Sequence, residues 1–160
     1  VYCDKFHFED KALIFGDAAH AIVPFFGQGM NASFQDCTVM NKLITKHDGK
    51  WGNVFSDFSK YHVPNGHAIA NMALENYIEM RDSVNDTHFK RRRELEFELE
   101  EKFRDRFIPR YSMVSFHDIP YSKVYERGLV QLSLINRYLS NDLSKKKLYE
   151  GVLTELTPLQ

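Results

Sequence analysis

The sequence predicts a chain that is mostly α-helical, with one or a few strands. Apolar residues recur at helical spacing along much of its 160 residues. A single short apolar run, Ala12-Leu13-Ile14-Phe15, has the composition of a buried strand. The length is sufficient for a hydrophobic core, and a net charge of −1 gives no indication of a nucleic-acid partner.

The first third of the chain is expected to contain a strand over 11–16, a loop over 17–29 and a helix over 30–47. Lys46 and Gly49 are typical of a helix end, because a basic side chain favours the last turn and glycine favours the position beyond it. Every third or fourth residue of the helix should face the core. The residues that approximate this face are Phe34, Cys37, Thr38, Asn41 and Ile44.

The remainder of the chain is expected to form a series of helices. Pro64-Asn65-Gly66 should separate the first two, because proline lacks a main-chain donor and clashes with the preceding turn. Ile108-Pro109 should end the third, and a short mixed segment follows over 111–116. The expected helices cover 51–61, 67–84, 87–106 and 120–141.

A glycine-rich stretch over 16–32 follows the predicted strand. The carboxylate of Asp17 can accept hydrogen bonds from ribityl or ribose hydroxyls. Gly27 and Gly29 allow the backbone to approach a flat ring, and the N–H groups of the helix that begins near Met30 can stabilise negative charge on it. This order of strand, acid, glycine-rich loop and helix suits a bound cofactor. The alternative is an ordinary strand–loop–helix connection.

The stretch Gly16-Asp17-Ala18-Ala19-His20 with Pro24-Phe25-Phe26-Gly27-Gln28-Gly29-Met30-Asn31 resembles the second FAD motif of class A flavin-dependent aromatic hydroxylases. Its two phenylalanines, and the later segments 76–81 and 107–114, resemble the kynurenine 3-monooxygenase branch. The resemblance implies an α/β enzyme with a Rossmann-like FAD-binding domain and a substrate domain. Residues 1–50 would then be the C-terminal part of the FAD-binding domain, and residues 51–160 a helical region that contributes to the substrate pocket.

The resemblance also implies the reaction, in which FAD, NADPH and O2 convert L-kynurenine to 3-hydroxykynurenine in tryptophan degradation. The flavin carries the chemistry, so no catalytic side chain and no metal ligand is expected. The implied FAD contacts are Gly16, Asp17, Gly29, Met30 and Asn31. The implied substrate contacts are Pro24, Phe25, Asn76, Glu79, Met80 and Tyr111.

Polar residues in apolar surroundings have simpler interpretations. Asn76 lies in an apolar helical stripe, where its amide must find a partner. His20 is expected to pack in the loop, and His62 and His67 lack the spacing of a metal site. The basic run over 90–93 precedes several glutamates and is expected to be a solvated helix face with ion pairs.

The chain lacks a Gly-x-Gly-x-x-Gly fingerprint after an N-terminal strand, so we expect it to be the C-terminal portion of a larger enzyme. Eukaryotic members of the resembling branch attach to the cytosolic face of the mitochondrial outer membrane through a hydrophobic C-terminal segment. Residues 154–160 are too short and polar for that anchor, and a cytoplasmic location is expected if it is absent. Two alternatives stay open: another class A hydroxylase, for instance one of quinone biosynthesis, and an inactive fragment.

Overall fold

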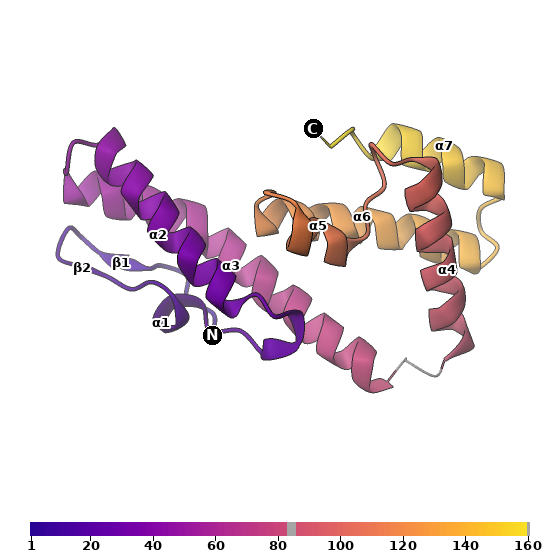
Figure 1. The fold of residues 1–160 in the computed structure, drawn as a ribbon, viewed down its shortest axis with the longest axis horizontal. Coiled ribbons are helices and arrows are strands. Elements are labelled where there is room, and N and C mark those ends of the chain that lie inside the picture. Colours follow the sequence, from indigo (N-terminus) through magenta and orange to yellow (C-terminus); the bar gives the residue numbers. More distant parts are fainter. Residues whose placement is uncertain (83–85, 160) are drawn as a thin grey trace. The chain divides into compact units, whose positions relative to one another are not determined.

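The computed structural model describes residues 1–82 and 86–159. Helices make up most of this part of the chain, and its two strands form one small sheet (Figure 1). The expectation of a mostly helical chain is therefore confirmed. The chain divides into two compact units, Val1–Tyr77 and Ile78–Gln160. This division lies inside a helix, and the functional division expected at residue 50 stays a prediction.

The sheet is an antiparallel hairpin of β1 (His7–Phe8) and β2 (Ala12–Leu13), in which His7 pairs with Leu13. The predicted strand over 11–16 is wrong in both extent and burial, because Ile14 and Phe15 are 39% and 54% exposed. A short apolar run has no periodicity that would distinguish a buried strand from an exposed extended segment.

The predicted loop over 17–29 contains a one-turn helix, α1 (Asp17–His20), and a short 3-10 helix, η1 (Pro24–Phe26). The next helix, α2 (Gly29–Lys46), confirms the expected helix over 30–47. Its buried face is not the one expected, since Phe34 is 62% exposed. The face toward the first unit's core carries Ala32, Asp36, Val39, Met40 and Leu43, near Phe6, Ala19 and Phe58.

The long helix α3 (Trp51–Asp82) runs through Pro64 without a break, so the predicted separation into two helices is wrong. Pro64 is exposed, whereas the helix is buried on both sides of it, at Phe58 and at Ile69. The side chain of Asn65 also donates a hydrogen bond of 2.7 Å to the carbonyl of Tyr61. Packing of both halves outweighs the cost of a proline inside a helix, which is about 3 kcal/mol.

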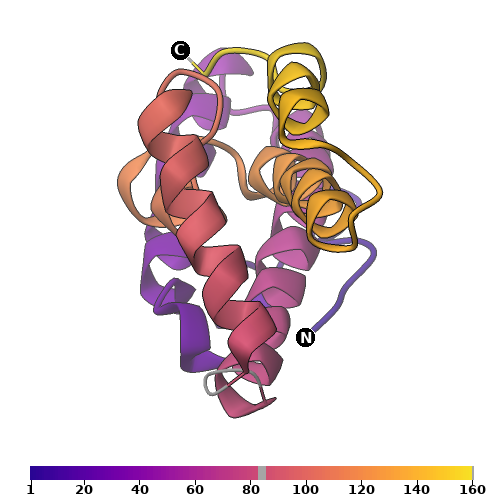
Figure 2. The same ribbon diagram turned by 90° about the vertical axis from the view of Figure 1, so that its right-hand side faces the viewer.

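The second unit continues with α4 (Thr87–Lys102), α5 (Arg110–Phe116), α6 (Tyr121–Leu139) and α7 (Lys145–Glu155). Figure 2 shows α4 alongside α6 and α7, and α6 packs against α4, α5 and α7. Two expectations are corrected: the helix over 87–106 ends at Lys102, and the mixed segment over 111–116 is helical. Beyond the helix end, Phe103 and Phe107 are buried in the core of the second unit. The core contains Leu95, Leu99, Phe103, Phe107, Leu134, Ile135, Leu148, Val152 and Leu156.

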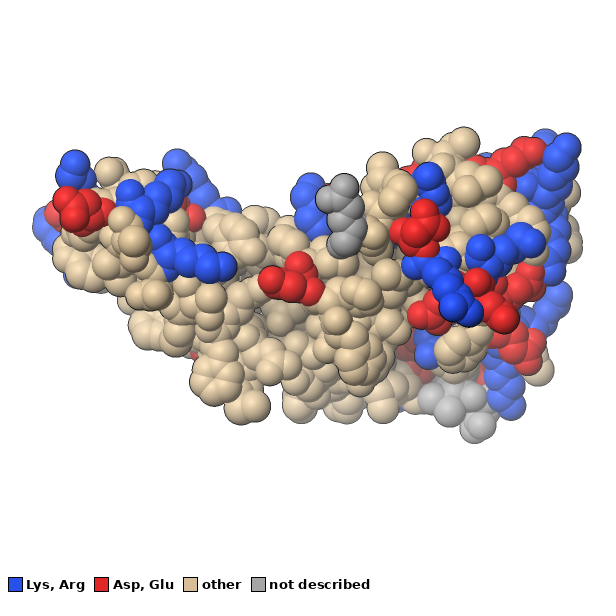
Figure 3. Space-filling model, turned by 45° about the horizontal axis from the view of Figure 1, so that its top comes forward, with Lys and Arg blue, Asp and Glu red and all other residues tan. Residues whose placement is uncertain are grey.

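Acidic and basic side chains intermingle on the second unit, at the right of Figure 3. Arg92 pairs with Glu79 and Glu96, and Arg93 lies 2.8 Å from Glu96. These pairs agree with the ion-paired helix face expected for residues 90–93. No helix within residues 1–82 and 86–159 has the length and apolar character required to span a membrane.

Candidate functional site

The Gly16–Asp17 turn is fixed by a buried carboxylate of the neighbouring helix. Gly16 has φ +60°, a conformation that side chains rarely adopt, and its N–H donates a hydrogen bond of 2.7 Å to Oδ2 of Asp36. Asp17 follows as the first residue of α1 and is exposed. Asp17, the predicted cofactor-binding carboxylate, is therefore exposed on a turn whose main chain is hydrogen-bonded to the buried Asp36.

The glycine-rich loop leads directly into the first turn of α2. Gly27 has φ +66°, and a Cβ atom built on it would meet nothing within 4 Å, so the space beside the loop is open. The residue that precedes the helix, Gln28, makes no side-chain cap, and the first N–H groups of a helix have no partner within it. Met30 is 69% exposed, and the Asn31 amide donates to the Gln28 side chain at 3.1 Å.

These groups fit the flavin end of FAD. The Asp17 carboxylate is an acceptor for ribityl hydroxyls, and the start of an 18-residue helix offers N–H donors and a positive dipole end to a ring oxygen. The open side of Gly27 leaves room for a flat ring beside the main chain. The predicted contacts Gly16, Asp17, Gly29, Met30 and Asn31 thus belong to one turn and one helix start of the same unit.

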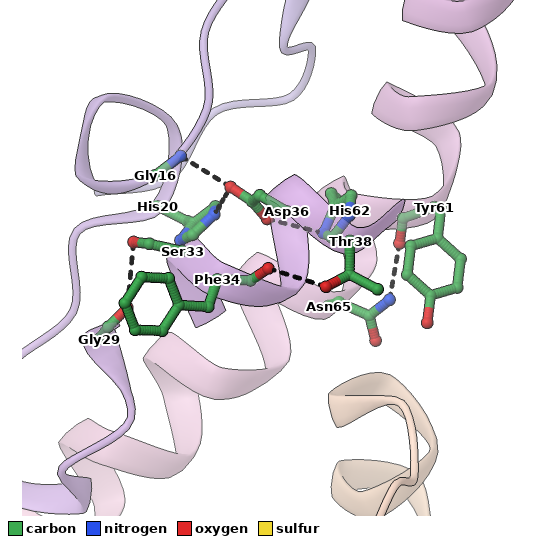
Figure 4. Close-up of polar contacts among 10 residues, drawn as sticks. All are labelled: Gly16, His20, Gly29, Ser33, Phe34, Asp36, Thr38, Tyr61, His62 and Asn65. Carbon is green, nitrogen blue, oxygen red and sulfur yellow. Dashed lines mark hydrogen bonds and ion pairs between the residues drawn. The ribbon is translucent and has the colours of Figure 1, made fainter. Parts of the chain in front are cut away.

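Behind this surface lies a polar cluster of Asp36, His20 and His62 (Figure 4). Asp36 is only 1% exposed, and its Oδ2 lies 2.7 Å from Nε2 of His20. Its Oδ1 lies 3.1 Å from Nδ1 of His62, although the two atoms are not aligned as a hydrogen bond. Nε2 of His62 is buried and has no hydrogen-bond partner among the described residues. His20 was expected to pack in the loop, and its burial agrees.

The two histidines differ in protonation. Burial lowers the pKa of His20, but its hydrogen bond to Asp36 and the negative charge of that residue outweigh burial and raise the pKa above its ordinary value. Burial lowers the pKa of His62 to about 4, against the attraction of Asp36 and with the repulsion of His20. The cluster thus favours one buried ion pair, between Asp36 and His20, and a neutral His62.

Three of the predicted substrate residues lie in the first unit. The Asn76 amide donates a hydrogen bond of 2.7 Å to the carbonyl of Phe25, so the polar residue of the apolar stripe finds a partner in the loop. The Phe25 ring contacts the Tyr77 ring, with centroids 4.5 Å apart and planes tilted by 38°. Pro24 begins η1 and is exposed. Tyr77 was not among the predicted substrate residues, although its ring packs directly on that of Phe25.

The other three predicted substrate residues lie in the second unit. Glu79 forms an ion pair with Arg92, so its charge is already balanced within the protein. Met80 is 55% exposed, and Tyr111 is in the first turn of α5 and 51% exposed. Among the residues that the structure describes, no group of three or more His, Cys, Asp or Glu side chains could hold a metal ion.

The sequence is similar to characterised families over most of its length. Residues 1–55 match the family model of an FAD binding domain. The chain is 41% identical to kynurenine 3-monooxygenase of Myxococcus xanthus over 157 residues, which cover 95% of this chain and 34% of that protein. It is 43% identical to the enzyme of that name from Cytophaga hutchinsonii, over 83% of this chain and 30% of the relative.

A relative from Sus scrofa, also called kynurenine 3-monooxygenase, is 42% identical over 87% of this chain and 30% of its own length. The chain therefore spans about a third of the length of these relatives. The match to the FAD binding domain covers the turn, the loop and the whole of α2.

Proposed function

We propose, from its similarity to kynurenine 3-monooxygenases, that this chain forms part of an FAD-dependent monooxygenase that hydroxylates L-kynurenine to 3-hydroxykynurenine. NADPH is the proposed reductant, and O2 is the proposed oxidant. The observation that carries the proposal is the exposed Asp17 turn beside the uncapped start of α2. When bound, FAD supplies the redox chemistry, and the protein supplies orientation and exclusion of water.

In this proposal the first unit binds the flavin. Asp17 accepts hydrogen bonds from the ribityl chain, and the N–H groups of the first turn of α2, at Gly29, Met30 and Asn31, face the ring oxygens. Gly16 contributes through its conformation, because its positive φ directs the chain into the turn that presents Asp17.

The proposed substrate contacts provide an apolar wall and polar groups for the amino-acid end of kynurenine. Pro24 and Phe25 exclude water from the ring that reacts. The Asn76 amide of the first unit can pair with a carboxylate or an amine. Taken separately, the Tyr111 hydroxyl of the second unit can donate to a carboxylate. Met80 adds apolar surface. Glu79 has the weakest support of the predicted set, because Arg92 already neutralises it.

The alternative hydroxylases of quinone biosynthesis have less support. The relatives described above all carry the name kynurenine 3-monooxygenase, over 83% or more of this chain. These relatives come from bacteria and from pig, so a mitochondrial outer-membrane location is proposed only for a eukaryotic source.

The proposal is tested on the full-length gene product that contains this chain. We expect a stoichiometric flavin absorbance band after FAD is added and the protein is desalted. We also expect NADPH oxidation that L-kynurenine stimulates, with formation of 3-hydroxykynurenine. A protein that binds no flavin would support the inactive fragment, and a quinone precursor as the better substrate would support the other hydroxylases.

The site assignment is tested by Asp17→Ala. Hydrogen bonds to a charged group contribute about 1.5–3 kcal/mol, so FAD affinity should fall roughly ten- to hundredfold while the fold persists. The matched control is Asp4→Ala, which removes another exposed carboxylate of the same unit. Equal FAD affinity of the two variants in a titration would remove Asp17 from the site.

A further inference from the structure

We propose that Asp36 is a positioning residue that holds the Gly16–His20 turn in the conformation that presents Asp17 to the flavin. This inference rests on the proposed function, because it assumes that Asp17 faces FAD. The geometry that leads to it lies entirely within the first unit, and it concerns a buried charge that the sequence analysis did not single out.

One oxygen atom of Asp36 ties both ends of the turn, and these two contacts are called the clamp below. Oδ2 of Asp36 lies 2.7 Å from the main-chain nitrogen of Gly16 and 2.7 Å from Nε2 of His20. Only Asp17, Ala18 and Ala19 lie between these two residues. Movement of Asp17 away from α2 would therefore strain or break a hydrogen bond to a buried carboxylate, which is stronger than one between neutral groups.

The turn has little stability of its own. α1 has four residues, and an isolated helix of this length is unfavourable in water. Its N-cap residue, Gly16, has no side chain and makes no cap hydrogen bond, and glycine pays a large entropy cost when it is ordered. Asp36, on a neighbouring helix, accepts from the N–H of Gly16, the donor that an acidic side chain three residues into the helix accepts from in a capping box.

Helix α3 supports the clamp from the other side. A Cβ atom on Gly66 would lie 3.1 Å from Cβ of His20, so the glycine leaves the space that the histidine occupies. His62, one turn earlier on α3, approaches the second oxygen of Asp36 at 3.1 Å. The carboxylate is therefore confined between a turn and two helices.

Asp36 therefore fixes the Asp17 turn relative to the start of α2, which are the two parts of the proposed flavin site. The proposed ring contacts Gly29 to Asn31 are the first residues of α2. Asp36 lies on the same helix, about two turns later. Because Asp36 also ties down the turn, one rigid helix fixes the position of the ribityl acceptor relative to the ring donors. A loss of Asp36 should disturb this relation before it unfolds the unit.

The test compares Asp36→Ala and Asp36→Asn with Asp57→Asn in the full-length gene product. Asp57 is a matched control, because it also pairs with a histidine, His47 at 2.8 Å. It also links α2 to α3 away from the turn, through Lys46 at 3.0 Å. Asparagine at position 36 keeps one acceptor oxygen, so it is the conservative variant. If the alanine variant fails to fold, Asp36→Asn and His20→Gln, which each remove part of the clamp, provide the comparison.

The first readout is amide hydrogen exchange of the flavin-free protein, over a peptide that contains residues 16–20. We expect exchange there to become at least tenfold faster in Asp36→Ala and less so in Asp36→Asn, with no change in Asp57→Asn. The second readout is the FAD dissociation constant, which should rise roughly ten- to hundredfold in Asp36→Ala and by less in Asp36→Asn.

Wild-type exchange over residues 16–20 in both Asp36 variants would overturn the inference, as would an equal loss of FAD affinity in Asp57→Asn. A wild-type protein that binds no FAD would overturn the proposed function instead. In that case the exchange comparison alone still decides whether Asp36 holds the turn.

Discussion

Asn76 and Phe25, which are 51 residues apart in the sequence, are joined by a hydrogen bond of 2.7 Å from the side-chain amide to the main-chain carbonyl. The bond connects α3 to η1, the short 3-10 helix that contains Phe25. It gives the Asn76 amide the partner that its position in an apolar stripe requires, in addition to the proposed contact with substrate. Replacement of Asn76 should therefore alter the substrate site both directly and through the position of Phe25.

We expect Asn76→Ala to lower kcat/KM for L-kynurenine roughly ten- to hundredfold, because a contact to a charged group contributes about 1.5–3 kcal/mol. FAD content should stay close to that of the wild type, because the flavin contacts belong to other elements. The measurements are kynurenine-stimulated NADPH oxidation and flavin absorbance after desalting.

The matched control for Asn76 is Asn71→Ala on the same helix. The Asn71 side chain accepts a hydrogen bond of 2.7 Å from the Tyr2 hydroxyl, and neither residue is among the proposed substrate contacts. The control should lose a similar amount of stability, about 0.5–1.5 kcal/mol for one hydrogen bond, and keep its kcat/KM. If both variants lose turnover equally, Asn76 acts through stability alone.

Tyr111→Phe tests the proposed substrate residue of the second unit. The change removes only a hydroxyl, so kcat/KM for L-kynurenine should fall roughly ten- to hundredfold if that hydroxyl donates to the substrate carboxylate. FAD content should not change. Tyr138→Phe is the control, because Tyr138 packs against the second unit's core. Wild-type turnover in Tyr111→Phe would remove this residue from the site.

Local sequence patterns predicted well those features that depend on neighbours along the chain. The bounds of α2 and the mostly helical content follow from apolar periodicity, and the glycine-rich loop follows from its turn residues. The proline in α3 was misjudged, because packing of Phe58 and Ile69 on either side of it outweighs a local preference.

The buried polar cluster was not predictable in the same way. Asp36 occupies the core-facing row of α2, where hydrophobicity alone places an apolar side chain, so the periodicity led to a face that includes the exposed Phe34. The one feature of the sequence that pointed to a buried carboxylate was an aspartate on the same helix face as Ala32 and Met40. Its partners His20 and His62 come from other elements, and only the fold brings them together.

The neutral His62 predicts a dependence of stability on pH. Its pKa is about 4 in the folded protein and near 6.5 when the chain is unfolded, so the unfolded state binds more protons between these values. The free energy of unfolding should therefore fall as the pH drops from 6.5 to about 4. At about 1.4 kcal/mol for each pKa unit, the loss is roughly 2–3 kcal/mol.

His62→Gln should reduce this loss of stability at acidic pH, because glutamine does not titrate. Asp36 on α2 and His20 on α1 act on the pKa of His62, and the rings of Phe58 and Tyr61 pack against it. The raised pKa of His20 acts in the opposite sense, since its contribution is complete at low pH and is lost as the pH rises above 6.5. Urea unfolding at several pH values between 4 and 6.5 measures the difference. Parallel curves for the variant and the wild type would contradict the prediction.

Gly151→Ala tests the packing of α7 against α6 in the second unit. A Cβ atom at Gly151 would lie 2.6 Å from Cδ2 of Leu134, whose side chain is 1% exposed and confined by the core. Overpacking of a core typically costs about 1–3 kcal/mol, whereas the gain in helix propensity from glycine to alanine is about 1 kcal/mol. We expect the clash to dominate, so the variant should be less stable than the wild type.

Gly52→Ala is the control, because its Cβ would make only an ordinary contact at 3.7 Å with Asp10 and should leave the helix equally or more stable. Urea unfolding of both variants, followed by circular dichroism, should move the midpoints in opposite directions. A midpoint for Gly151→Ala at or above that of the wild type would show that Leu134 can move aside, and that the contact between the two helices is looser than the structure indicates.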